Sequence, residues 1–269
     1  MADGLKELAS VDGVVTPTVE ATLPLKDDGI YRGDGAFEVI RLYEGRPFAL
    51  GDHVDRLERS AAAIELSFDR AALEAEIEAL LAAAGAPDGQ LRLIVTRGGR
   101  RIAATESLPP HPDTVTVATV TYSPTVILDG VKSLSYAANM QSTRLAKGQG
   151  ADEAVLVRPD GIVLEPPTSA IFWVSPEGDL RTPALSVGVL ESITRDRLVK
   201  ALHVDEGAWD AADLRAAHEA FLASTTREIQ AIAAIDGREL PDAPGPRTRE
   251  AQEAFGATLG RELRTTTSR

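Results

Sequence analysis

Lysine is scarce in this chain, which narrows the residues that can do amine chemistry. Of the 28 basic residues, 23 are arginines and five are lysines, at positions 6, 26, 132, 147 and 200. Lys132 lies in the mostly apolar segment Val131–Tyr136, whereas the other four have polar or charged surroundings. In a strand over this segment, Lys132 and Leu134 would share one face. Such a lysine is either a surface side chain with an apolar stem or a buried amine with a lowered pKa.

An acid and two groups of hydroxyls are the next candidates. Glu165 follows the apolar segment Ile162–Leu164, so it is either a turn residue or a buried acid that needs a partner. Gly188–Arg195 leads directly into a predicted helix, where a hydroxyl is either an ordinary cap or part of an anion site. Ser224–Thr226 lies between two apolar runs and is by itself a turn. Spacing alone does not show whether the two hydroxyl groups meet at one phosphate.

Two further glycine-rich turns have charged neighbours. Gly33–Gly35 precedes a predicted strand rather than a helix, which excludes a dinucleotide-binding turn of the Rossmann type. Gly98 and Gly99 follow a predicted strand and are flanked by Arg97, Arg100 and Arg101. That turn is either a solvated basic loop or a contact for a carboxylate or phosphate group.

Composition excludes several functional classes. The net charge of −13 and the pI near 4.8 argue against nucleic acid or an anionic membrane as the main partner. The absence of cysteine excludes disulfides, thiolate metal sites and cysteine nucleophiles. The four histidines lack a paired ligand spacing, so we expect no metal site. The first residues resemble no signal peptide and no segment is long and apolar enough to span a membrane, so we expect a cytoplasmic location.

The elements that position these residues follow from periodicity. Strands are predicted over Val14–Glu20 and Ala36–Tyr43, with Phe48–Leu50 returning as a hairpin partner. Two amphipathic helices follow, the first capped by Asp52 and the second capped by Asp69 and ended by Gly85. Further strands are predicted over Leu91–Arg97, Val115–Tyr122, Ala154–Val157, Ile162–Leu164, Ile171–Val174 and Glu228–Ile235, with a loop between the first two. Further helices are predicted over about Ala138–Lys147, Thr194–Leu202 and Arg247–Leu263, before a frayed tail.

The mixture of strands and helices without strict alternation predicts two α+β domains. We place an N-terminal domain at residues 1–122, a linker at 123–127 around Ser123-Pro124-Thr125, and a C-terminal domain that carries Lys132 at 128–269.

Motifs in a fixed order extend from about Asp27 to Gly237. They are Gly33–Glu38, His53–Ser60, Lys132–Tyr136, Gly150–Ala154, Asp160–Glu165, Arg181–Pro183, Ser192–Arg195 and Phe221–Thr225. Together they resemble the class IV aminotransferases, the pyridoxal-phosphate enzymes of fold type IV. That family includes D-amino acid and branched-chain aminotransferases, (R)-selective amine transaminases and 4-amino-4-deoxychorismate lyase. The resemblance implies two domains with the cofactor between them.

The resemblance also implies roles for individual residues. Lys132 matches the catalytic Schiff-base lysine, which also moves the α-proton as a general base. Glu165 matches the acid that pairs with the pyridine nitrogen, and Arg56 matches the arginine that binds the cofactor phosphate. Other residues implied to contact pyridoxal phosphate are Tyr136, Thr168, Leu190, Ser192, Ile193, Thr194 and Thr225. The chain departs from the family pattern at three positions, where Pro166, Ala170 and Ser192 replace the usual Gly, Asn and Gly.

The substrate is the least determined part of the resemblance. An amino acid needs a cation for its carboxylate, and the Arg-x-His pair of some D-amino acid aminotransferases is absent. The candidate substrate-binding residues are Arg32, Phe37, Arg97, Arg100 and Thr226, with Arg101 as a further cation. Phe37–Arg41 is closer to the D-amino acid pattern than to the branched-chain one, which has Gly in place of Val39. The family's homodimers would let Arg32 act in the partner's site.

We therefore expect a pyridoxal-phosphate-dependent transaminase with a ping-pong mechanism. Its partners would be a small-molecule amino donor and an α-keto acid acceptor, with D-amino acids favoured over branched-chain L-amino acids. The alternatives are 4-amino-4-deoxychorismate lyase, which releases pyruvate, and an (R)-selective amine transaminase. A non-catalytic family member is disfavoured because Lys132, Glu165 and Arg56 are all present.

Overall fold

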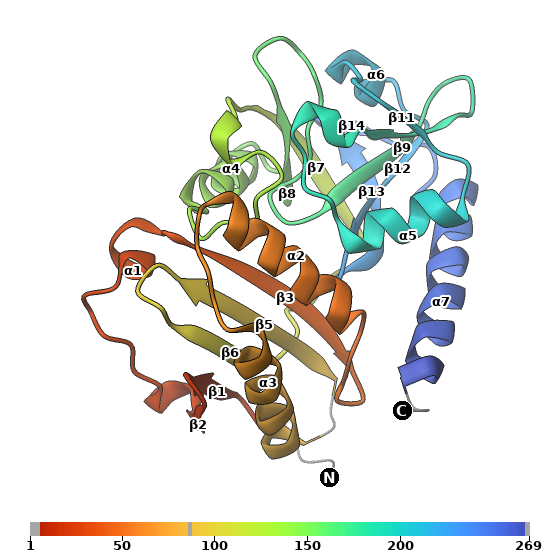
Figure 1. Cartoon of the computed structure of the whole chain (residues 1–269). Coiled ribbons are helices and arrows are strands. Elements are labelled where there is room, and N and C mark those ends of the chain that lie inside the picture. Colours follow the sequence, from red (N-terminus) through yellow and green to blue (C-terminus); the bar gives the residue numbers. More distant parts are fainter. Residues whose placement is uncertain (1–5, 86–87, 267–269) are drawn as a thin grey trace. The chain divides into compact units, whose positions relative to one another are not determined.

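The chain divides into two compact units. The computed structural model describes residues 6–85 and 88–266. Unit 1 comprises Met1–Pro110, Val131–Tyr136 and Glu262–Arg269, and unit 2 comprises His111–Gly130 and Ala137–Arg261. Each unit contains one sheet and several helices (Figure 1), which confirms the expected α+β class.

Unit 1 contains a six-stranded sheet in the order β2-β1-β6-β5-β3-β4. The strands are β1 (Leu8–Val11), β2 (Val14–Pro17), β3 (Gly35–Tyr43), β4 (Arg46–Pro47), β5 (Gly89–Thr96) and β6 (Arg101–Glu106). The helices are η1 (Thr18–Glu20), α1 (Asp28–Arg32), α2 (Leu50–Ala63) and α3 (Arg70–Ala84). Helices α2 and α3 pack against β3 and β6, as the lower part of Figure 1 shows.

Alternation along β3 explains how this core forms. Ala36, Ile40 and Leu42 are buried on the face that meets α2, which presents Val54 and Leu57 in return. Glu38 belongs to the same even-numbered register and is fully buried, so a carboxyl group lies inside an apolar layer. A buried carboxylate must be paired and hydrogen-bonded.

Unit 2 contains an eight-stranded sheet in the order β11-β10-β9-β12-β13-β7-β8, with β14 paired to β13. The strands are β7 (Thr114–Thr121), β8 (Glu153–Val157), β9 (Ala170–Val174), β10 (Leu180–Pro183), β11 (Asp205–Gly207), β12 (Glu219–Ser224), β13 (Glu228–Ile235) and β14 (Arg238–Glu239). The helices are η2 (Val126–Leu128), α4 (Ala137–Gly148), η3 (Leu185–Val187), α5 (Ile193–Ala201), α6 (Ala211–Arg215) and α7 (Pro246–Thr266), of which the part from Glu262 belongs to unit 1. Its core includes Trp173, Ile171 and Leu222.

The division of the chain differs from the boundary expected at residues 123–127. Strand β7 pairs in parallel with β13 and β8, so it belongs to the sheet of unit 2. Residues 131–136 belong to unit 1 instead, through an antiparallel bridge between Ala36 and Ser133. Both assignments depend on pairing over long sequence separations, which composition along the chain does not report.

Local chemistry also corrects several element boundaries. Glu44 and Gly45 both have positive φ, 49° and 75°, so the chain reverses in two residues and β4 replaces the return strand expected at Phe48–Leu50. Helix α2 consequently begins earlier, with Ala49 rather than Asp52 at its N-cap. The N-cap Asp69 and the C-cap Gly85 of α3 are confirmed.

Other expected elements also change. Ile162–Leu164 and Val131–Tyr136 form isolated bridges rather than strands. The expected early strand is the short β2, which pairs with β1. The segment expected to be a loop after β5 contains β6, which pairs with β5 and β1. The expected tail begins inside α7, and residues 267–269 lie outside the described residues.

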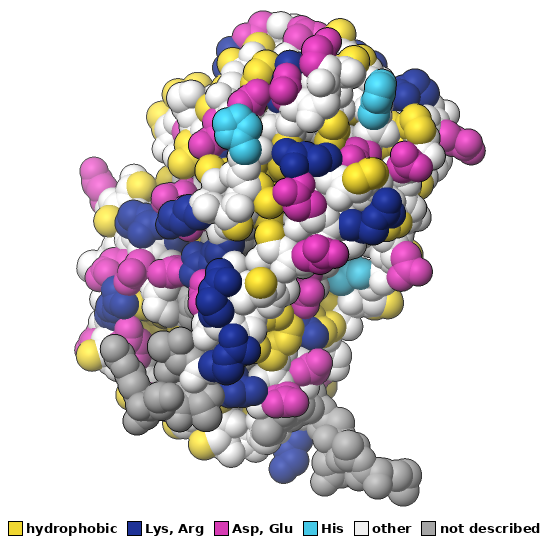
Figure 2. All heavy atoms as spheres, turned by 90° about the vertical axis from the view of Figure 1, so that its right-hand side faces the viewer, with side chains coloured by type: hydrophobic (Ala, Val, Ile, Leu, Met, Phe, Trp, Pro, Cys, Tyr) yellow, Lys and Arg dark blue, Asp and Glu magenta, His cyan; other side chains and the backbone are white. Residues whose placement is uncertain are grey.

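Figure 2 shows one face on which acidic and basic side chains are interspersed. Among the described residues, no helix is long and apolar enough to cross a membrane. The same residues contain no group of three or more His, Asp or Glu side chains suited to a metal ion.

Candidate active site

The Lys132 segment is fixed to two elements of unit 1. Its carbonyl accepts a hydrogen bond from Phe37 N at 3.0 Å, and its own N–H donates to Ser60 Oγ on α2 at 3.2 Å. The Lys132 Nζ lies 4.4 Å from the centroid of the Phe37 ring and 6.0 Å from that of Tyr136. The two rings meet edge to face at 5.2 Å. The amine is therefore held against aromatic faces, which favour a cation.

Glu38, His53 and Arg56 form a buried triad on the face of β3 opposite Phe37. Arg56 donates from Nε to Glu38 Oε1 and from NH2 to Glu38 Oε2, each at 2.7 Å. His53 Nδ1 lies 2.8 Å from Glu38 Oε2. The Glu38 and His53 side chains are fully buried, and that of Arg56 is 7% exposed. His53, Arg56 and Ser60 share one face of α2, so Arg56 lies about one turn and His53 about two turns before the residue that anchors Lys132.

Charges in the triad set its protonation. Burial alone would raise the pKa of Glu38, but the charge and hydrogen bonds of Arg56, with those of His53, lower that pKa to about 2. Burial lowers the pKa of His53 against the opposing effect of Glu38, and the charges of Arg56 and Lys132 lower it further. A neutral imidazole therefore donates from Nδ1 to a carboxylate at neutral pH. Within the described residues, His53 Nε2 is buried without a hydrogen-bond partner.

In unit 2, Glu165 and the start of α5 are connected through one backbone group. Leu190 N donates to Glu165 Oε1 at 2.8 Å, which fixes the carboxylate beside the segment that leads into α5. Ser192 caps that helix through a hydrogen bond from Arg195 N at 3.3 Å. Ile193 and Thr194 form its first turn and are buried.

Buried hydroxyls test whether a cofactor phosphate fits unit 2. Thr194 Oγ1, at the N-terminus of α5, has no hydrogen-bond partner among the described residues. Ser169 Oγ, next to the expected cofactor residue Thr168, is likewise buried without a hydrogen-bond partner among the described residues. Unsatisfied buried hydroxyls are costly, and a helix N-terminus favours an anion. The residues present therefore fit a group that brings phosphate oxygens.

Sheet pairing brings Thr225 and Thr226 to the same end of the sheet as Thr168. Ala223 of β12 pairs with Ala170 of β9, so the turn Thr225–Arg227 and the residues before β9 lie at neighbouring strand ends. Arg227 NH2 reaches Thr168 Oγ1 at 3.4 Å and Glu153 Oε2 at 2.6 Å. Thr225 and Thr226 are half-buried in this turn.

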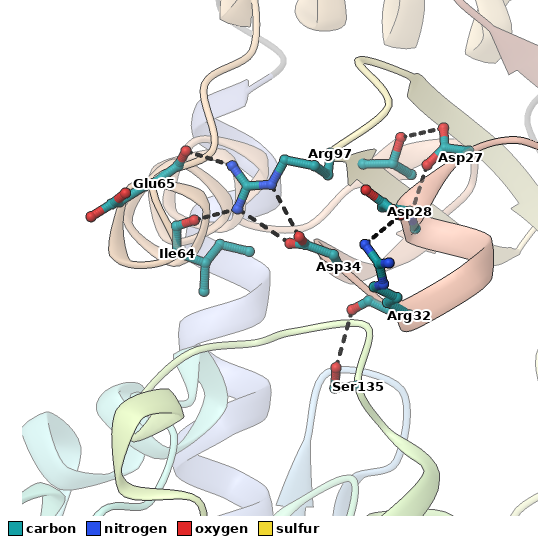
Figure 3. Close-up of polar contacts among 11 residues, drawn as sticks. Asp27, Asp28, Arg32, Asp34, Ile64, Glu65, Arg97 and Ser135 are labelled. Atoms are coloured by element: carbon teal, nitrogen blue, oxygen red, sulfur yellow. Dashed lines mark hydrogen bonds and ion pairs between the residues drawn. The ribbon is translucent and has the colours of Figure 1, made fainter.

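The arginines expected to bind a substrate differ in their partners (Figure 3). Arg97 donates to both carboxylate oxygens of Asp34 and to the carbonyls of Ile64 and Glu65, which uses four of its five N–H groups. Arg100 pairs with Asp12. The Arg32 side chain is 73% exposed and pairs with Asp28 at 3.1 Å. Arg32 is thus the candidate with the most accessible guanidinium, since those of Arg97 and Arg100 are about one-third exposed.

The structure groups the expected residues by unit. Unit 1 brings Lys132, Phe37 and Tyr136 into contact. Sequence reasoning missed Glu38 and His53 as partners of Arg56, although both stand inside quoted motifs. The available signal was a glutamate at a core position of an alternating strand, which requires a cation nearby.

Comparison with known proteins identifies the family. The family model for amino-transferase class IV matches residues 35–235. A D-alanine aminotransferase from Bacillus licheniformis is 33% identical over 88% of this chain and 91% of its own. A putative branched-chain-amino-acid aminotransferase from Methanocaldococcus jannaschii is 30% identical over 91% of this chain and 94% of its own.

Two further similarities bear on the reaction and the cofactor. A bifunctional aminodeoxychorismate lyase and D-amino acid transaminase from Mycobacterium tuberculosis is 30% identical over 88% of this chain and 94% of its own. A pyridoxal-phosphate-bound hypothetical aminotransferase from the same species has a TM-score of 0.84 and 27% identity, covering 94% of this chain and 98% of that one. The chain therefore belongs to the class IV aminotransferases and is a pyridoxal-phosphate-dependent aminotransferase.

Proposed function

We propose that this aminotransferase takes its amino group from D-amino acids, with D-alanine as the leading donor, and passes it to an α-keto acid in two half-reactions. The observation that carries the preference is the similarity to a D-alanine aminotransferase along almost the whole chain. The segment Phe37–Arg41 supports the same choice, because Val39 stands where the branched-chain pattern has Gly. Branched-chain L-amino acids are the competing donors.

When bound, pyridoxal phosphate supplies a carbonyl carbon for the amino group and a ring that accepts electrons. Lys132 Nζ would hold the cofactor and then move the α-proton. The Phe37 and Tyr136 rings keep that amine in place, and the hydrogen bonds of its backbone to β3 and α2 restrict where it points. Glu165, oriented by Leu190 N, would hold a proton on the ring nitrogen.

The phosphate would be bound by residues that keep a fixed geometry without it. Arg56 is oriented by two hydrogen bonds to Glu38. The first turn of α5 contributes backbone N–H groups and the Thr194 hydroxyl. Thr225 lies in the turn that follows β12. Sites whose donors are already oriented bind an anion with a smaller loss of conformational entropy.

Single-turnover half-reactions test the proposed donor. Purified holoenzyme is mixed with D-alanine, L-valine or L-leucine without a keto acid, and the change in cofactor absorbance is followed. The fastest change is expected with D-alanine, and a faster change with the L-amino acids would overturn the preference. Lys132→Ala should lose the half-reaction while Lys147→Ala, an exposed lysine of α4, should retain it. Parallel lines in double-reciprocal plots would support the ping-pong order.

The lyase is the second candidate, and the bifunctional relative from Mycobacterium tuberculosis favours it. Incubation with 4-amino-4-deoxychorismate and no keto acid should then release pyruvate. Release at a rate comparable to D-alanine turnover would make this chain bifunctional too, and no release would restrict it to amino transfer. An (R)-selective amine transaminase would instead react with 1-phenylethylamine, which has no carboxylate.

Homodimerisation is also proposed, since exposed apolar side chains precede Arg32 in unit 1. Val19 is 93% exposed, Leu25 71% and Tyr31 57%. Covering them in a second copy of the chain would remove apolar surface from water and bring Arg32 beside that copy. Light scattering on Leu25→Glu should show monomers if this segment is the interface. The cytoplasmic location expected from the sequence stays a prediction.

A further inference from the structure

The turn between β12 and β13 contains Arg227, whose side chain contacts residues outside the turn. Ser224 pairs with Glu228, and the three intervening residues reverse the chain, with Glu228 at a φ of 58°. Arg227 N donates to Ser224 Oγ at 3.2 Å, which fixes the backbone of the turn. The Arg227 side chain is 14% exposed, and its guanidinium contacts residues of unit 2.

Glu153 is the acid that this guanidinium meets. Arg227 NH2 donates to Glu153 Oε2 at 2.6 Å, and the Glu153 side chain is 6% exposed. The other carboxylate oxygen accepts from Thr143 Oγ1 of α4 at 2.8 Å. Glu153 begins β8, while Arg227 immediately precedes β13. The two strands flank β7 and run parallel to it, but Glu153 pairs with Val117, which is level with Ile235, so the contact with Arg227 is made by side chains and not by strand register.

The same guanidinium makes two further contacts. Its NH1 donates to Gln230 Oε1 at 3.1 Å, and its NH2 lies 3.4 Å from Thr168 Oγ1. Thr168 belongs to the loop that follows Glu165, whereas Thr225 and Thr226 belong to the turn of Arg227 itself. One guanidinium therefore connects the loop of Thr168 to the turn of Thr225 and Thr226.

We propose that Arg227 and Glu153 are positioning residues that hold the Thr225–Thr226 turn against the Thr168 loop in the geometry that binds the cofactor. The proposal rests on the proposed roles of those threonines. A surface ion pair would contribute little to any loop. This pair is nearly buried and hydrogen-bonded at both ends, so it restricts the turn more strongly than the exposed pairs of the unit do.

Cofactor affinity measured apart from turnover tests the proposal. Pyridoxamine 5′-phosphate is titrated into the cofactor-free full-length protein, with tryptophan fluorescence as the signal, because this ligand cannot bond covalently to Lys132. Arg227→Gln is expected to raise its dissociation constant by about tenfold, which corresponds to about 1.4 kcal/mol of binding free energy. The dissociation constant of pyridoxamine, which lacks the phosphate, should rise by a smaller factor if the effect acts through the phosphate.

Arg181→Gln is the matched control. Arg181 pairs with Asp213 in the same unit, and their side chains are 15% and 21% exposed. Both variants should lower the melting temperature, but only Arg227→Gln should change the dissociation constant. If both variants bind pyridoxamine 5′-phosphate as the wild type does, or if both weaken its binding by the same factor, the Arg227–Glu153 pair contributes to stability alone.

Milder variants keep the test valid if Arg227→Gln does not fold. Arg227→Lys keeps the charge but not the planar fork, and Thr168→Val removes one acceptor. Each should weaken binding by a smaller factor, and Glu153→Gln with Arg227→Gln should weaken it less than the product of the single effects. Multiplicative effects would refute the coupling. Donor preference is measured in wild-type protein, so its failure is distinguishable from the failure of this proposal.

Discussion

Each unit of this aminotransferase contains a buried arginine–glutamate pair, and the two pairs differ in what they connect. In unit 1, Glu38 and Arg56 belong to regular elements, β3 and α2, and lie inside one apolar layer. In unit 2, Arg227 stands in a turn and Glu153 at the first residue of a strand. The first pair orients one side chain, whereas the second connects a turn to a neighbouring loop.

The partners of the two acids explain this difference. Glu38 accepts two hydrogen bonds from Arg56 and has His53 beside it, all on a rigid strand and helix. The Arg227 guanidinium divides its bonds among Glu153, Gln230 and Thr168. We therefore expect replacement of Glu38 mainly to lower the stability of unit 1. Replacement of Glu153 should mainly displace the Thr225–Thr226 turn of unit 2.

Removing the charge of Glu38 is expected to have the largest effect on stability. Glu38→Gln leaves Arg56 in an apolar layer without its counter-ion, which costs about 3–5 kcal/mol for a buried pair. Urea denaturation measures this loss. Glu106→Gln is the control, since Glu106 pairs with Arg92 in the same sheet at 29% exposure and should cost under about 1 kcal/mol. Equal losses for both variants would remove the distinction between buried and exposed pairs.

Glu153→Gln is expected to cost less than Glu38→Gln. The Gln amide can still bond to Thr143, and the Arg227 side chain is close enough to the surface to turn toward solvent. The free energy of unfolding should fall by about 1–3 kcal/mol. The same denaturation series checks the order, and a loss that reached that of Glu38→Gln would contradict our comparison.

Acid should destabilise unit 1 in two steps. The pKa of His53 is lowered from 6.5 in the folded protein, so below pH 6.5 the unfolded chain binds a proton that the folded one does not. Stability falls there by at most about 1.4 kcal/mol per pH unit. The pKa of Glu38 is lowered from 4.5 to about 2, so its contribution is present above 4.5 and lost as the pH falls toward about 2.

Comparison of His53→Asn with wild type isolates the first step. Asn keeps a donor for Glu38 but does not titrate, so its stability should fall less between pH 6.5 and pH 4.5, the unshifted values of His and Glu. Urea midpoints across that interval measure the difference. Parallel curves for the two proteins would show that His53 does not titrate on unfolding.

Arg32→Ala should have the smallest effect on stability, within about 0.5 kcal/mol, because its pair with Asp28 is exposed. A rise in KM for D-alanine, without a matching change for 1-phenylethylamine, is expected if Arg32 binds the carboxylate. An Asp28→Ala control separates loss of the ion pair from loss of the cation. An unchanged KM for D-alanine in Arg32→Ala would show that Arg32 does not bind the carboxylate and would leave the other arginines as candidates.

Local elements were the most predictable part of the fold. Alternation over β3 and the three-four spacing of α2 gave these elements from sequence, and the cap at Asp69 follows from an interaction within four residues. The end of β3 at Tyr43 was predicted correctly, but the return strand was wrongly placed at Phe48–Leu50 because the turn at Glu44 and Gly45 is tighter than a general turn pattern implies. Isolated bridges at Ser133 and Val163 were mistaken for strands because apolar composition reports burial, not pairing.

The sequence by itself determined the family and led to the prediction of Lys132 as the reactive amine, because motif order and the scarcity of lysine do not depend on the arrangement in space. Only the tertiary structure decided that β7 belongs to unit 2, that Arg97 binds Asp34 and two carbonyls, and that Glu38 and Glu153 hold the arginines they do. These outcomes depend on strand register and on side chains far apart along the chain. Local periodicity contains no record of such partners, since it reflects only which face of an element is buried.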